Sequence, residues 1–99
     1  MPTFAVLLED NLEQVANIRR LHMQAHLDFL GRHAAAIRAA GPLHDASVGQ
    51  PAGGLWLVEA NDAGAVAVLT REDPFWAAGL RRSIRILEWR QVFADGRRR

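Results

Sequence analysis

The sequence contains no cysteine, which excludes disulfide bonds and thiolate-based metal or redox sites. It also lacks any stretch approaching the ~20 uncharged apolar residues that a membrane-spanning helix requires. The apolar residues 1–8 have no basic leading segment, and Glu9 and Asp10 follow them directly, so they do not resemble an export signal. We therefore expect a cytoplasmic protein with no membrane partner, held together by its own core or by a partner subunit.

The chain also lacks a large net charge of either sign. Its 12 basic and 11 acidic residues leave a formal net charge of +1, and Arg97, Arg98 and Arg99 supply a large share of the basic side. A nucleic-acid-binding surface would need basic residues gathered on one folded face. At 99 residues the chain suits one domain. We predict a domain over residues 1–94, a basic disordered tail over residues 95–99, and no nucleic-acid partner.

The first part of the chain predicts a strand followed by a long helix. Residues 3–8 form a short apolar run that is typical of a strand, and Asn11 can cap the helix that follows. Gly31 lies inside the helical pattern and allows a kink, before Gly41 and Pro42 end the helix at about residue 39. The predicted inward stripe repeats at three- and four-residue steps and consists of Val15, Ile18, His22, Ala25, Phe29, His33 and Ala36.

The remaining segments alternate between strand and helix. They predict a strand over residues 42–48, a hairpin turn over 49–54, a central strand over 55–58, a second helix that starts at Asn61 or Asp62 and stops before Pro74, and a last strand over 83–93. The segment between the second helix and the last strand is predicted to be a loop or short turn. No internal repeat of fixed period is visible.

This order of elements predicts an α+β fold of the ferredoxin-like βαββαβ type, with a four-stranded antiparallel sheet and both helices on one face. The other face would then expose apolar groups such as Trp56 or Leu57 and Trp89. Soluble monomers rarely leave so large an apolar patch in water. We therefore predict a homodimer that forms through the sheet.

Three short motifs occur along the chain in the same order as in the YCII-related (YciI-like) family, which the sequence therefore resembles. They are His26-Leu27 on the first helix, Ala-Gly-Pro-Leu at residues 40–43, and Asp73-Pro74-Phe75 followed by Ala78-Gly79. The resemblance spans nearly the whole chain. It implies a dimeric ferredoxin-like fold related to the muconolactone isomerases, with a His/Asp pair in a pocket between helix and sheet. Some members are dehydrochlorinase-like proteins that act on chlorinated hydroxyquinols.

His26 is the first candidate catalytic residue, because an imidazole can accept and return a proton near neutral pH. Such a base needs a carboxylate that fixes its tautomer and stabilises its charged form. Asp73, in the loop before Pro74, and Asp45, after the second motif, are the two candidates. A packed boundary histidine and a turn-forming aspartate are the structural alternatives to these roles.

The same motifs suggest residues that contact a substrate, namely Gly41, Pro42 and Phe75. The family often has an arginine three residues before the helix histidine, where Met23 stands here, so Arg20 or Arg19 is the substitute for binding an anion. His22 lies four residues before His26, but no third ligand stands at a recognisable spacing, so no metal site is predicted.

The resemblance implies an isomerase or lyase that transfers a proton on a small cyclic or enolisable substrate, without a cofactor. The glycines form neither a GxGxxG nor a GxxxxGK signature, and the serines lie in no nucleophile motif. The alternative is a non-catalytic domain that binds a small metabolite or serves in assembly.

Overall fold

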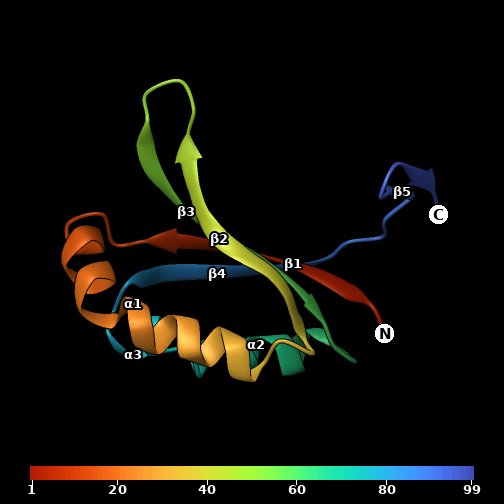
Figure 1. Ribbon diagram of the computed structural model, residues 1–99, viewed down its shortest axis with the longest axis horizontal. Coiled ribbons are helices and arrows are strands. Elements are labelled where there is room, and N and C mark those ends of the chain that lie inside the picture. Colours follow the sequence, from red (N-terminus) through yellow and green to blue (C-terminus); the bar gives the residue numbers. More distant parts are fainter.

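The computed structural model describes all 99 residues and consists of one sheet with helices packed on one side (Figure 1). In chain order the elements are β1 (Thr3–Asp10), α1 (Val15–Arg32), β2 (Ile37–Asp45), β3 (Gln50–Glu59), α2 (Ala63–Arg71), α3 (Pro74–Ala77), β4 (Arg81–Glu88), β5 (Phe93–Ala94) and β6 (Arg97–Arg98). No helix is long and apolar enough to cross a membrane.

The sheet has the strand order β2-β3-β1-β4, and every neighbouring pair is antiparallel. The helices lie on one side of it, and the β2–β3 hairpin projects past its edge (Figure 1). This arrangement confirms the predicted α+β, ferredoxin-like fold. Strand β3 is central, between β1 and β2, and its apolar run places Trp56 and Val58 in the core and Leu55 and Leu57 on the face that no helix covers.

Helix α1 is shorter than predicted, which corrects the expectation that it runs to about residue 39. It ends at Arg32, and the amides of Ala36 and Ile37 bond to the carbonyl of His33 in a tight turn. The chain then enters β2, where Ile37 is buried and pairs with Val58. Burying Ile37 in the sheet is favoured over extending the helix, so His33 and Ala36 leave the predicted stripe.

Asn11 does not cap α1. Its side-chain amide donates instead to the carbonyl of Gly79 at 2.8 Å, and the helix begins four residues later, after Gln14, which makes no capping bond. The contact spans 68 residues of sequence and fixes the β1–α1 connection to the loop before β4. Local capping rules could not indicate it, because the partner comes from another element.

The hairpin between β2 and β3 turns earlier than predicted. The turn lies over residues 46–49, where Gly49 has a φ of +69°, and residues 50–54 belong to β3. Gly53 also has a positive φ, +98°, and a Cβ atom there would lie 1.9 Å from the carbonyl oxygen of Leu8. This glycine therefore serves close approach of β3 to β1 and not the hairpin turn.

The last strand of the sheet is also displaced, since β4 covers residues 81–88 and not 83–93. The segment before it, predicted as a loop or short turn, contains the four-residue helix α3. After β4 the chain forms the β5–β6 pair, with Asp95 and Gly96 in left-handed conformations at its turn. The predicted division into a domain over 1–94 and a disordered tail over 95–99 stays a prediction.

Two apolar clusters form the core on the helix side of the sheet. The larger lies between the sheet and helices α1 and α2 and consists of Phe4, Val6, Leu8, Phe29, Ile37, Trp56, Val58 and Val66. The smaller joins the start of α1 to α3 and the loop before β4 and consists of Val15, Ile18, Phe75 and Leu80. Trp56 is thus buried on the helix side, whereas Leu57 and Trp89 belong to the opposite face or its edge.

Candidate active site

A buried imidazole and a buried carboxylate meet where α1 passes the start of α3. His26 Nδ1 lies 2.8 Å from Asp73 Oδ1, and the two residues are 7% and 2% exposed. Because an ionised carboxylate only accepts hydrogen bonds, this partner assigns the proton of neutral His26 to Nδ1. The lone pair then lies on Nε2, which is the arrangement that a histidine base requires.

Both residues owe their positions to local structure. His26 lies on the buried stripe of α1 together with Val15, Ile18 and Phe29. Asp73 precedes Pro74, which is pre-formed for the first turn of α3, and its Oδ1 also accepts a bond of 3.2 Å from the backbone N–H of Phe75. Asp73 is therefore a helix cap and a histidine partner at once.

Aromatic rings enclose the imidazole. Phe75 stacks on His26 with ring centroids 4.1 Å apart and an angle of 16° between the planes, and Trp56 lies 6.4 Å away. Nε2 of His26 makes no hydrogen bond within the chain. Nε of Arg81 is the one fully buried side-chain nitrogen or oxygen without a partner. Nε2 of His26 is therefore not fully buried, and no side chain of the protein occupies its lone pair.

A second polar cluster lies on the same phenylalanine ring. Asp10, at the end of β1, accepts a bond of 2.7 Å from Arg81 Nη1 at Oδ1 and one of 3.3 Å from Arg19 Nη2 at Oδ2. The guanidinium carbons of Arg19 and Arg81 lie 5.4 Å and 5.5 Å from the centroid of Phe75. Phe75 therefore connects the histidine pair to a buried group of three charges.

The other predicted site residues lie elsewhere. Asp45 is exposed at the end of β2, where the hydroxyl and the amide of Ser47 lower the pKa of its carboxyl group. Arg20 is exposed and bonds to Asn17, while Gly41 and Pro42 are exposed on β2. Of the predicted residues, the structure brings together His26, Asp73 and Phe75, and Arg19, the alternative to Arg20, lies over the ring of Phe75.

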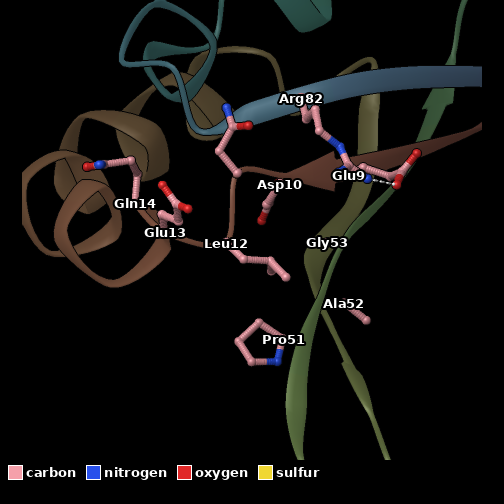
Figure 2. A pocket seen from close by; sticks show the side chains of 10 residues that line it. Glu9, Asp10, Leu12, Glu13, Gln14, Pro51, Ala52, Gly53 and Arg82 are labelled. Atoms are coloured by element: carbon pink, nitrogen blue, oxygen red, sulfur yellow. Dashed lines mark hydrogen bonds and ion pairs between the residues drawn. The ribbon is translucent and has the colours of Figure 1, made fainter.

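Neither of the two main hollows on the surface is lined by His26. The larger, about 590 Å³, lies between the β1–α1 connection and the first residues of β3 (Figure 2). Its wall includes Asp10, Glu13 and an ion pair of Glu9 with Arg82, and this pair lowers the pKa of Glu9. The hollow therefore approaches the site from the side of Asp10 and not from the imidazole.

The smaller hollow, about 340 Å³, lies on the sheet face that no helix covers. It is lined almost entirely by apolar side chains, namely those of Ala5, Leu55, Leu57, Leu87 and Trp89, together with Glu88. Leu87 and Trp89 are exposed. This face is the candidate surface for a partner subunit.

Residues 3–90 match the family described as the YCII-related domain. The chain belongs to the YCII-related family. The match covers most of this YCII-related protein and confirms the resemblance that its motifs suggest. No curated protein sequence matches it.

A solved structure shares the fold of this YCII-related protein. It is 5-chloro-2-hydroxyhydroquinone dehydrochlorinase (TftG) from Burkholderia phenoliruptrix AC1100, in complex with 2,5-dihydroxybenzoquinone. The two are 26% identical, with a TM-score of 0.76 over 89% of this chain and 93% of the other. That neighbour is an enzyme that removes hydrogen chloride and holds a small cyclic ligand.

Sequence reasoning missed Asp10 and Arg81. A signal for Asp10 was present, because it continues the two-residue period of Phe4, Val6 and Leu8 and so falls on the buried face of β1. A carboxylate on a core face needs a cationic partner. Nothing local could indicate that this partner is Arg81, which lies 71 residues away in the sequence.

Proposed function

We propose that this YCII-related protein is a lyase or isomerase in which His26 transfers a proton on a small cyclic or enolisable substrate. Asp73 holds the imidazole in the tautomer with the proton on Nδ1 and stabilises the imidazolium that forms after Nε2 accepts a proton. The observation that carries this proposal is the 2.8 Å contact between His26 and Asp73 with Nε2 left free.

The dehydrochlorinase neighbour, similar along most of both chains, favours elimination of hydrogen chloride as the reaction. On 5-chloro-2-hydroxyhydroquinone, one hydroxyl proton would first move to the chlorine-bearing ring carbon, giving a keto tautomer. Nε2 of His26 would then remove a second hydroxyl proton. The electron pair left on that oxygen forms a second carbonyl, the ring double bond shifts, and chloride leaves with the electrons of the carbon–chlorine bond. The products are hydroxybenzoquinone, chloride and one proton.

The surroundings of His26 support this chemistry. Phe75 and Trp56 are almost fully buried, and their rings pack beside the imidazole and limit its contact with water. In this water-poor setting the carboxylate of Asp73 stabilises the protonated ring more strongly than it would in water.

The test compares two histidine variants on one helix. The purified protein is incubated without oxygen with 5-chloro-2-hydroxyhydroquinone, and released chloride and quinone absorbance are followed. We expect His26→Gln to lower turnover about a hundredfold or more, because it removes the titrating group. His22→Gln, one turn earlier on α1, should leave turnover nearly unchanged.

Two results would contradict the proposal. One is full turnover by His26→Gln. The other is saturable binding of the quinol, or of an enol lactone tested beside it, with no change in the ligand when the mixture is analysed by mass spectrometry. The second result would favour the alternative function, a domain that binds a small metabolite without converting it.

We further propose that two copies pair through the uncovered sheet face. The apolar hollow on that face is bordered by Leu57 and Leu87, with Trp89 at its edge, and a second copy would present the same surface. Pairing would remove from water the apolar patch that a lone chain leaves exposed.

A further inference from the structure

The charges around Asp10 do not balance. Two guanidinium groups, those of Arg19 and Arg81, share this single carboxylate, whose side chain is almost fully buried. Guanidinium groups remain charged at any ordinary pH. The cluster therefore carries one positive charge more than its own residues neutralise.

Asp10 is shared unequally. Arg81, whose side chain is 4% exposed, makes the shorter bond at 2.7 Å, and Arg19 the longer one at 3.3 Å. Gly54 leaves room for Arg81, because a Cβ atom there would lie 3.2 Å from Nη1. The ion pair of Asp10 with Arg81 is therefore the stronger of the two, and the positive charge of Arg19 is less fully neutralised than that of Arg81.

Arg19 also has access that Arg81 lacks. Its side chain is 20% exposed, and its guanidinium lies over Phe75, the ring that stacks on His26. Arg20, the next residue, is exposed and bonds to Asn17. Of these two neighbouring arginines, one lies at the site and one does not.

We propose that Arg19 binds an anionic group of the substrate, a carboxylate or a phenolate, and that Arg81 is a positioning residue which acts through Asp10. By occupying Asp10, Arg81 leaves Arg19 able to bind an external anion. The identification of this anion as part of a substrate rests on the proposed function. The binding of an anion does not, and it can be measured without any turnover.

Benzoate and benzamide are suitable probes, because they have nearly the same shape and differ in charge. Isothermal titration at constant ionic strength should show benzoate binding at least about tenfold more tightly than benzamide. Arg19→Gln should weaken benzoate binding about tenfold to a hundredfold and leave benzamide unaffected. This variant retains the bond between Asp10 and Arg81, so the fold keeps its buried pair.

Arg20→Gln is the matched control, because it removes the same charge from the next position of the same helix. We expect a change of less than about twofold in its benzoate affinity. Asp10→Asn tests the sharing of charge directly, because it removes the anion that competes with benzoate. Its affinity for benzoate should rise about threefold or more, whereas a purely structural carboxylate would give no increase.

Equal binding of benzoate and benzamide would overturn the proposal, as would equal losses in the Arg19 and Arg20 variants or no benzoate binding by the native protein. These outcomes are separate from failure of the proposed function. If turnover depends on His26 and Arg19 has no role in binding, the proposed reaction is supported and the proposed anion site is wrong. Benzoate binding through Arg19 without any turnover would do the opposite.

Discussion

Asp73 makes two contacts with one oxygen atom. Its Oδ1 accepts a bond from His26 Nδ1 and another from the N–H of Phe75. The first contact concerns the chemistry of the imidazole, and the second caps helix α3. The two roles can be separated, because capping needs only an oxygen acceptor whereas stabilising an imidazolium needs negative charge.

The variant Asp73→Asn separates the capping role of residue 73 from its role beside the imidazole. The amide oxygen can still accept the bond from Phe75, so the thermal midpoint should fall by no more than a few degrees. Turnover should fall about a hundredfold or more, because the uncharged amide cannot stabilise protonated His26. Circular dichroism and chloride release measure the two effects.

Asp62→Asn is the control for this experiment. Asp62 caps α2 through a bond of 2.8 Å from the amide of Ala65 and has no histidine partner. Its replacement should have a similarly small effect on stability and none on turnover. If Asp73→Asn keeps full activity, the carboxylate has no catalytic role and Asp73 is a cap alone.

At the scale of elements, the packing of β3 against β1 depends on a glycine. Gly53 combines a φ of +98° with a separation from the Leu8 carbonyl that no side chain would permit. The neighbouring Gly54 gives space to Arg81. The junction of β1, β3 and β4 thus links a backbone requirement to the charged cluster at Asp10.

Gly53→Ala should lower the free energy of unfolding by about 2 kcal/mol or more, because it adds a backbone clash to an unfavourable φ. Gly31→Ala is the comparison. A Cβ atom at residue 31 meets nothing within 4 Å, and the residue lies in the last turn of α1, so this change should stabilise the protein by up to about 1 kcal/mol. Urea unfolding of both variants checks the opposite signs.

For the whole molecule, the prediction concerns the sheet face that no helix covers, which is the proposed dimer interface. We expect light scattering at micromolar concentration to give a mass near twice 11.0 kDa. Leu87→Glu places a charge in the middle of the proposed interface and should reduce the mass to that of one chain. Val68→Glu introduces the same charge at an exposed position on helix α2 and should leave the dimer intact.

A native protein that is monomeric under these conditions would contradict sheet pairing. A dimer that survives Leu87→Glu would instead place the interface on another surface. Neither result would alter the contact of His26 with Asp73, which lies within one chain.

The order of strands and helices could be predicted because it depends on local signals. The apolar periods and Pro74 indicate the elements, and the fold class that they imply is confirmed, although Gly41 and Pro42 lie inside β2 and do not end the first helix. The predicted ends of helices and strands were wrong where a contact with a distant residue outweighed the local conformational preference. Helix α1 stops at Arg32 since Ile37 is more stable when it pairs with Val58 in the sheet.

Only part of the candidate site could be predicted from the sequence, because its other contacts join residues that are far apart in the chain. The motifs indicated His26 and Phe75, and they left both Asp73 and Asp45 as candidate partners and both Arg20 and Arg19 as candidate substitutes for the missing arginine. Asp73 is 47 residues from His26, and it meets that ring because α3 packs beside α1. Which arginine faces inward depends on Asp10, whose own partner is on β4.

The sequence by itself determined that the chain has no disulfide, that its strands and helices follow one another in a ferredoxin-like order, and that a histidine lies on the first helix. These properties depend on composition and on contacts a few residues long. The tertiary structure alone decided which carboxylate meets the imidazole and which guanidinium lies over Phe75. Both are contacts between side chains far apart in the sequence, and their geometry exists only once β4 has paired with β1 and helices α1 and α3 have packed on the sheet.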